Sequence, residues 1–143
     1  MRAAKYSGAS GEHLTSNIDQ HPGTVAANDP SHPALIVRHQ NIRWSYAEFV
    51  AEVDRFATGM LALGIAQGDR VGIWSPNRYE WVVTQFATSK TGAILVCLNP
   101  ALRLSELEYS LNQSGSKAML SSESSKTSYH ISMLARYPPS CTN

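Results

Sequence analysis

Gly68-Asp69-Arg70-Val71-Gly72-Ile73-Trp74-Ser75-Pro76-Asn77 is a polar turn that leads into a short apolar segment. The apolar residues predict a buried strand over 70–75. Asn77 is followed by Glu80, the spacing at which an N-cap and a reach-back carboxylate close the first turn of a helix, so a helix is predicted over 78–91. A strand followed directly by a capped helix is the unit from which α/β sheets are built.

The same plan recurs further along the chain. The uninterrupted apolar run over 93–98 predicts a central strand buried on both faces. Ser105 with Glu108 predicts another capped helix that Gly115 ends, and 117–120 predicts another strand. Strand starts about 23 residues apart suit a β-α-β-α-β alternation. We therefore expect parallel strands joined by right-handed helical crossovers.

Upstream of this alternation lie a predicted hairpin and a long predicted helix. Residues 34–38 and 42–44 flank a polar turn and predict two antiparallel strands. Ser45 with Glu48 forms a capping box, which predicts a helix over 46–63. Its apolar stripe is expected to pack on the core rather than to bind lipid or a partner helix. The stripe consists of Phe49, Val53, Phe56, Met60 and Leu63.

One further helical surface follows from the same spacing rules. The buried side of the helix over 78–91 is expected to carry Trp81, Val82, Gln85, Phe86 and Ser89, and Gly92 is expected to end the helix. Cys97 lies inside the apolar run and is predicted to be an inert, buried thiol.

The predicted fold class is α/β: a partial open parallel sheet with flanking helices, a short β-hairpin and an irregular N-terminal arm. Residues 1–33 are rich in Gly, Ser, Asn, His and Pro and are expected to form the irregular arm. Residues 34–120 form the predicted α/β unit. Residues 121–143 are expected to be an irregular tail, because the stretch is polar and contains two adjacent prolines.

Composition excludes several classes of function. Twelve basic and eleven acidic residues leave a net charge of +1 with no Lys/Arg cluster, so nucleic acid is not an expected partner. The two cysteines and five histidines show no metal-ligand spacing. No apolar run is long enough for a transmembrane segment. We expect a cytoplasmic location, and a mitochondrial location is the alternative if the source is eukaryotic. The sequence does not indicate an oligomeric state.

Ligands of open parallel sheets bind beyond the carboxyl ends of the strands. Here those places are the loops over 75–78 and 99–103 and the segment after Leu120, and none of them is glycine-rich. Asn77 is interpreted as a helix cap, and Asp69 with Arg70 as a polar turn before a buried strand. We therefore assign no catalytic, cofactor-binding or metal-binding residue.

Ordered blocks of this chain resemble a known family, the AMP-dependent (adenylate-forming) synthetases and ligases, in their N-terminal subdomain. The resemblance spans about residues 34–120. Its blocks are Trp44-Ser45-Tyr46-Ala47-Glu48-Phe49, residues 64–71, Ser75-Pro76-Asn77, Lys90-Thr91-Gly92-Ala93, Leu98-Asn99-Pro100 and Glu106-Leu107-Glu108-Tyr109. Residues 72–77 and 103–109 look most like the fatty-acyl-CoA synthetases, of medium-chain type.

The resemblance implies a two-step ligase. ATP and a fatty acid or another carboxylate give an acyl-adenylate, and coenzyme A then gives acyl-CoA, with Mg²⁺ supporting the phosphates. The family's Ser/Thr/Gly-rich loop ending in Lys, its aromatic-Gly-x-Thr-Glu segment, its ribose-binding Asp and its C-terminal catalytic lysine have no counterpart in this sequence. We therefore expect a truncated N-terminal fragment that is inactive alone and binds no cofactor itself. The alternative is a non-catalytic α/β interaction or small-ligand module.

Overall fold

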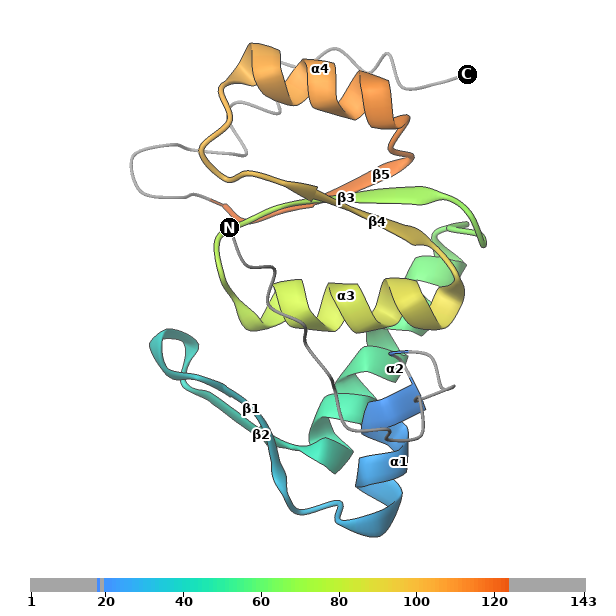
Figure 1. Ribbon diagram of the computed structural model, residues 1–143, viewed down its shortest axis with the longest axis vertical. Coiled ribbons are helices and arrows are strands. Elements are labelled where there is room, and N and C mark those ends of the chain that lie inside the picture. Colours follow the sequence, from blue (N-terminus) through green and yellow to red (C-terminus); the bar gives the residue numbers. More distant parts are fainter. Residues whose placement is uncertain (1–17, 19, 124–143) are drawn as a thin grey trace, which may run out of the picture.

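The computed structural model describes residues 18 and 20–123 and is an α/β structure, as predicted (Figure 1). An antiparallel hairpin and a three-stranded parallel sheet are combined with four helices in this part of the chain. The elements are α1 (Gln20–Asn28), β1 (Pro33–Val37), β2 (Ile42–Ser45), α2 (Tyr46–Ala62), β3 (Arg70–Trp74), α3 (Tyr79–Thr91), β4 (Ile94–Leu98), α4 (Leu104–Ser114) and β5 (Ala118–Ser121).

The hairpin turns through a short 3-10 helix, Arg38–Gln40. Asn41 follows with φ 55°, and asparagine tolerates this left-handed conformation better than most residues. The strands then pair with Val37 opposite Ile42 and Ile36 opposite Arg43. The predicted hairpin is therefore confirmed, with asparagine instead of glycine in the turn.

The capping box at the start of α2 is confirmed. The Ser45 amide donates to Glu48 Oε2 at 2.8 Å, and the Glu48 amide donates to Ser45 Oγ at 3.3 Å. Phe49, Val53 and Met60 of the predicted stripe are buried. Leu63 is 83% exposed instead, because the helix ends at Ala62 and the chain leaves its face there.

The parallel sheet has the order β4-β3-β5, and α3 and α4 cover its opposite faces (Figure 1). Val71 packs into the core with α2 and α3, whereas Trp74 packs with Leu98, Leu107 and Leu111 on the α4 side. Successive side chains of β3 thus alternate between two apolar layers. This alternation places the core on both sides of β3.

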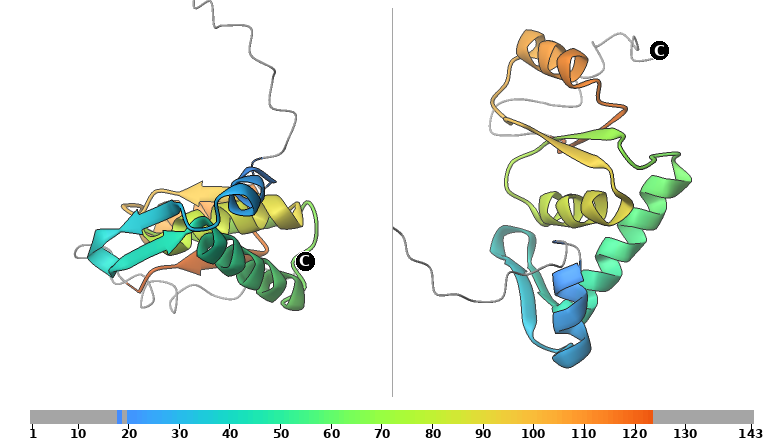
Figure 2. Two further views of the ribbon diagram at one scale, coloured as in Figure 1. Left: turned by 90° about the horizontal axis from the view of Figure 1, so that it is seen from below. Right: turned by 45° about the vertical axis from the view of Figure 1, so that its right-hand side comes forward.

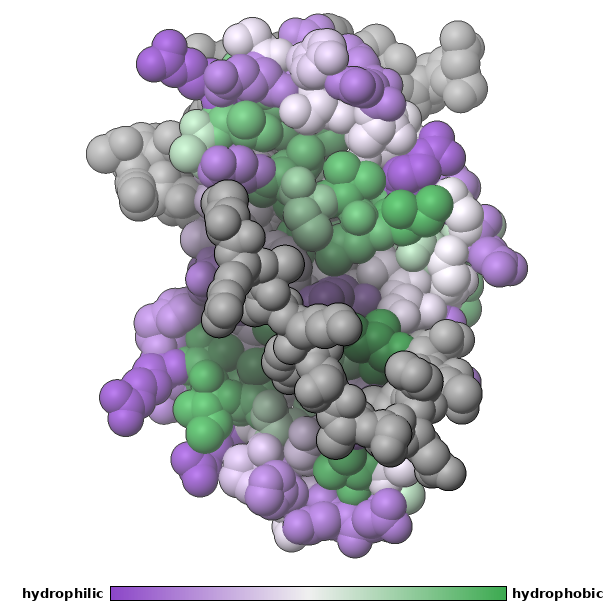
Figure 3. Space-filling view, viewed as in Figure 1, coloured by the Kyte–Doolittle hydropathy of each residue, from purple (hydrophilic) through white to green (hydrophobic). Residues whose placement is uncertain are grey.

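The prediction that residues 93–98 form the central strand is wrong. β3 is central and β4 is the outer strand, so Ile94 is 52% exposed and Cys97 is exposed rather than buried. Figure 3 shows the resulting hydrophobic surface between α3 and α4, over the sheet. A strand with a neighbour on only one side within the described residues keeps part of its apolar surface outside the core.

The predicted buried side of α3 is only partly correct. Val83 and Ala87 lie in the core, and Thr84 and Thr88 are buried with them, while Phe86 on the expected side is half-buried. α3 contacts both the sheet and α2, so two of its sides meet protein. A helix in such a position does not show the single apolar stripe on which the prediction depended.

The N-terminal arm differs from expectation, because Gln20–Asn28 form α1. Pro22 lies in the first turn, where its missing amide proton costs no helical hydrogen bond, and it is buried. α1 packs on α2, a contact that composition did not reveal. The rest of the predicted arm (1–17 and 19) and residues 124–143 of the predicted tail lie outside the described residues.

α4 begins earlier than predicted. Arg103, not Ser105, precedes the first turn, and its amide donates to Glu106 Oε2 at 2.8 Å. Ser105 lies inside the helix. Gly115 ends α4 with φ 60°, as expected. The helix therefore uses the reach-back carboxylate of Glu106 instead of that of Glu108.

Candidate functional site

A cavity of ≈ 340 Å³ lies at the carboxyl ends of β3 and β5. We call it the strand-end pocket; its lining includes Ile73 and Ser75 at the end of β3, Arg78 and Glu80 at the start of α3, and residues 120–123 at the end of β5. Phe56 of α2 and Thr84 of α3 also contribute to its wall. This is the edge of a parallel sheet at which ligands usually bind.

Two of the three predicted loops meet at this pocket. The loop over 75–78 and the segment after Leu120 both line it, because β3 and β5 are parallel neighbours. The loop over 99–103 is not among its lining residues. Its Asn99 carbonyl instead accepts a 2.9 Å hydrogen bond from Trp74 Nε1, on the other side of the sheet.

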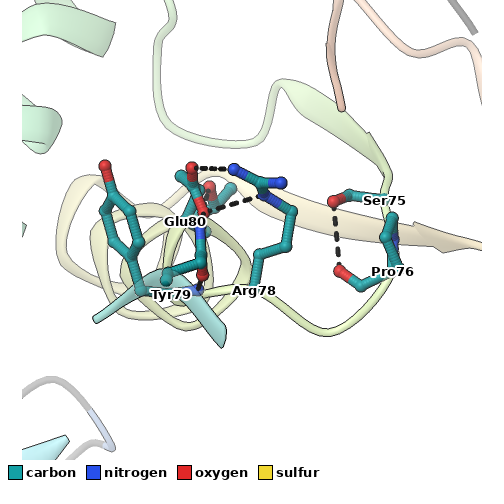
Figure 4. A network of polar contacts seen from close by, with 7 residues as sticks. Ser75, Pro76, Arg78, Tyr79 and Glu80 are labelled. Carbon is teal, nitrogen blue, oxygen red and sulfur yellow. Dashed lines mark hydrogen bonds and ion pairs between the residues drawn. The ribbon is translucent and has the colours of Figure 1, made fainter. Parts of the chain in front are cut away.

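Arg78 and Glu80 form the polar wall of the pocket (Figure 4). Arg78 Nη2 donates to Glu80 Oε1 at 2.9 Å, and Arg78 Nε donates to Glu80 Oε2 at 3.2 Å. Gln40, from the turn of the hairpin, donates through Nε2 to Glu80 Oε2 at 2.9 Å. A carboxylate held by a two-point arginine contact and an amide has a defined orientation.

Both charges of this pair are stabilised. Burial raises the pKa of Glu80, but hydrogen bonds from Arg78 and Gln40 outweigh it and hold the pKa below its ordinary value. The hydrogen bond with Glu80 raises the pKa of Arg78. Neither pKa moves toward neutrality, so the pair suits orientation and hydrogen bonding of a ligand rather than proton transfer.

Gln40 is a residue that sequence reasoning missed. Its Oε1 accepts a 2.8 Å hydrogen bond from the amide of Tyr79, the first residue of α3. Asn77 was predicted to cap this helix, and that prediction is wrong: the helix begins after Arg78, and Asn77 is exposed. Nothing in the local spacing could identify a cap that lies 39 residues away along the chain.

Asp69 and Arg70 lie at the opposite end of the sheet from the pocket. Asp69 Oδ2 accepts hydrogen bonds from Lys117 Nζ at 2.6 Å and from the Ala66 amide at 2.7 Å. Arg70 Nε donates to the Ser114 carbonyl at 3.0 Å. These contacts join loops at the amino ends of β3 and β5, which supports the structural interpretation of both residues.

The described residues contain no group of three or more His, Cys, Asp or Glu side chains that could hold a metal ion. None of the helices in residues 18 and 20–123 is long and apolar enough to span a membrane.

Comparison with known sequences identifies one family over most of the chain. The pattern of the family described as "AMP-binding enzyme" matches residues 23–139, which is wider than the blocks over 34–120. The chain is 39% identical over 137 residues to the medium-chain acyl-CoA ligase ACSF2, mitochondrial, of Homo sapiens. It is 43% identical over 115 residues to the protein of the same name from Bos taurus.

These alignments cover 95% and 80% of this chain but only 22% and 19% of the relatives. The chain thus spans about a fifth of the length of these ligases.

Solved structures show the same arrangement of elements. The N-terminal domain of FACL13 from Mycobacterium tuberculosis, solved with an inhibitor, superposes with a TM-score of 0.71 at 33% identity. The match covers 73% of this chain and 26% of that domain. The O-succinylbenzoate coenzyme A synthetase of Bacillus subtilis, solved with AMP, gives a TM-score of 0.67 at 29% identity, covering 74% of this chain and 27% of that protein.

Proposed function

This chain belongs to the AMP-binding enzyme family, and we propose that it supplies the N-terminal part of an ATP-dependent ligase that joins a medium-chain fatty acid to coenzyme A. The reaction forms an acyl-adenylate first and an acyl-CoA second, and it takes ATP, Mg²⁺ and coenzyme A as the family does. The observation that carries this proposal is the 39% identity to a medium-chain acyl-CoA ligase across 95% of the chain.

The role proposed for the described residues is that of a scaffold with one polar wall. The strand-end pocket supports this role, because its Arg78 and Glu80 neutralise each other and are oriented by Gln40. The pocket holds no pair of groups poised for proton transfer, and no metal ligands are grouped in the described part of the chain. We infer that the 143 residues alone do not activate a carboxylate.

One experiment tests the inactivity of the isolated chain. Carboxylate-dependent exchange between ATP and pyrophosphate is measured with octanoate and the purified 143-residue chain. No exchange above the enzyme-free background is expected. Measurable exchange that depends on octanoate would contradict the proposal that the described scaffold needs further catalytic groups.

A chimera tests the ligase proposal itself. The matched region of the Homo sapiens ligase is replaced by this chain, and formation of octanoyl-CoA is measured. Activity within about tenfold of the parent enzyme is expected if this chain is an equivalent scaffold, that is, a loss of no more than about 1.4 kcal/mol in transition-state stabilisation. A chimera that folds cooperatively but forms no acyl-CoA would favour the interaction-module alternative.

The location of the protein remains a separate prediction. The human and bovine relatives carry the word mitochondrial in their names, which describes those proteins. For this chain a cytoplasmic location stays the expectation, and fractionation of source cells followed by detection with a specific antibody would test it.

A further inference from the structure

Another cavity, of ≈ 330 Å³, lies between the turn of the hairpin and the beginning of α3. We call it the hairpin pocket. In Figure 1 and in the right panel of Figure 2, the turn of the hairpin lies next to the first turn of α3. Residues 36–39 line the pocket from the hairpin, and residues 77, 78, 81 and 82 line it from the start of α3. Of all these residues, only Arg78 also lines the strand-end pocket.

Hydrogen bonds and ring packing hold the two walls of the hairpin pocket in place. Gln40 joins the turn of the hairpin to the Tyr79 amide at 2.8 Å and to the Glu80 carboxylate at 2.9 Å. Trp44 of β2 packs edge-to-face against the Tyr79 ring, with 5.0 Å between the ring centroids. The pocket is therefore formed without a ligand, as is usual for sites that bind small molecules.

One part of the lining is apolar. Ile36 and Val37 contribute to it from β1, and Trp81 and Val82 contribute from α3. Ile36 is 52% exposed, although its neighbour Leu35 packs on the core. Accessible apolar side chains in a concave site are stabilised when a hydrocarbon chain covers them. This part of the lining suits the apolar portion of a ligand.

The other part of the lining is cationic. Arg38 and Arg78 belong to it, and no Asp or Glu is among the described residues that line the pocket. In the described part of the chain, the Arg38 guanidinium forms no ion pair and no hydrogen bond. Arg78 donates to Glu80 through Nε and Nη2, and further N–H groups of its guanidinium remain available. Guanidinium groups bind carboxylates through parallel hydrogen bonds, so this end suits an anionic head group.

An apolar wall beside a cationic end matches an amphipathic anion. We propose that the hairpin pocket binds one single-chain fatty carboxylate of medium length, with its carboxylate at Arg38 and Arg78 and its chain against Ile36 and Trp81. Ligand pockets range from about 300 to 1,000 Å³, and this one is near the lower limit, so it suits one short chain rather than the two chains of a phospholipid. Binding here involves no chemical step, so the proposal does not rest on the ligase function.

Titration of the 143-residue chain with octanoate, below the concentration at which octanoate forms micelles, tests the proposal. The indole N–H signals are followed by NMR. Trp81 lines the pocket, whereas Trp74 is fully buried and bonded to the Asn99 carbonyl, so its signal also reports that the chain is folded. The Trp81 signal is expected to shift until one octanoate is bound per chain, while the Trp74 signal stays unchanged. Equal shifts of both signals, or shifts that never saturate, would overturn the proposal.

Other compounds separate the head group from the chain. Octanol lacks the carboxylate, and acetate and inorganic phosphate lack the chain, so each is expected to bind at least about tenfold more weakly than octanoate. Phosphate or octanol binding as tightly as octanoate would reject the combined recognition. Vesicles that contain phosphatidylserine are not expected to sediment this chain. Co-sedimentation that octanoate prevents would assign the pocket to a membrane surface and overturn the proposal.

A matched pair of arginine variants tests the cationic end. Arg38→Gln removes the unpaired guanidinium from the lining and is expected to lower the affinity for octanoate by at least about tenfold. Arg43→Gln removes the same charge from β2, where Arg43 lies opposite Ile36 but is not among the lining residues. Its effect is expected to stay within about threefold, because a solvent-exposed charge outside the pocket acts only weakly. Equal losses in the two variants would contradict a specific carboxylate site at Arg38.

Discussion

The side-chain oxygen of Gln40 accepts a 2.8 Å hydrogen bond from the amide of Tyr79 and thereby caps α3 from the turn of the hairpin. The same side chain donates to Glu80, so a single amide satisfies two groups at the first turn of the helix. The hairpin is thus attached to the parallel sheet through the helix that follows β3. This attachment also sets the position of the polar wall in the strand-end pocket.

Replacing Gln40 by leucine removes the cap and one hydrogen bond to Glu80. We expect Gln40→Leu to lower the free energy of unfolding by about 1–2 kcal/mol, the usual cost of a lost helix cap. Urea unfolding followed by circular dichroism measures this change. His39→Ala, in the same turn at an exposed position, is the control and should stay within about 0.5 kcal/mol. A Gln40 variant as stable as this control would refute the capping role.

Trp74 is fully buried and donates to the Asn99 carbonyl at 2.9 Å. Trp74→Phe removes that donor and leaves a cavity in the layer that faces α4, so a loss of about 2–3 kcal/mol is expected. Trp81→Phe is the matched control, because Trp81 is only half-buried. Thermal unfolding of both variants should show the larger decrease in Tm for Trp74→Phe. A larger decrease for Trp81→Phe would contradict the stabilising role of Trp74 in the layer that faces α4.

Stability should fall as the solution becomes acidic. Hydrogen bonds from Lys117 and the Ala66 amide hold the pKa of Asp69 below its ordinary value of 3.8. The pKa of Glu80 is likewise below its ordinary value of 4.5. Because the folded state binds these protons less readily than the unfolded state, the stability they contribute is present above the ordinary values and is lost as pH falls through the folded pKa.

Urea midpoints measured between pH 7 and pH 3 test this dependence. Most of the decrease should lie below about pH 4.5, where the unfolded carboxyl groups begin to bind protons. Asp69→Asn should be less stable than the parent at pH 7, and the difference should shrink toward pH 3. A constant difference across the range would show that the carboxylate charge is not what stabilises this loop.

Cys97 is exposed on the outer strand β4, contrary to the sequence prediction. In a Cys141→Ser background, we expect a thiol reagent to label Cys97 in the native protein without denaturant. The labelling rate should be close to the rate in urea, because no unfolding is needed to reach the sulfur. Labelling that occurs only in urea would place Cys97 in the interior.

Local spacing predicted most elements of this fold. Ser45 and Glu48 lie three residues apart and satisfy each other within one helical turn, so their capping box needed no tertiary information. Gly92 and Gly115 end α3 and α4 in the left-handed region, with φ 75° and 60°. The strands over 70–74, 94–98 and 118–121 follow the predicted alternation with the helices.

The failures share one physical cause, which is dependence on partners distant in the chain. An apolar run indicates burial but not how many strands lie beside it. For this reason the prediction of a central strand over 93–98 fails, because β3 has that position. Asn77 has the spacing of a cap, but the side chain of Gln40 accepts the hydrogen bond from the first amide of α3 instead. α1 was not expected because its stability depends on packing against α2.

The order of amino acids along this chain therefore specifies the number and kind of its described strands and of most helices, and their limits to within about a residue, since these depend on contacts within a few residues. The order of the strands in the sheet, the cap of α3, the exposure of Cys97 and the pairing of Gln40 with Glu80 at the strand-end pocket arise only when distant segments meet. Those contacts are fixed by backbone pairing and packing between elements, which no short window of sequence contains.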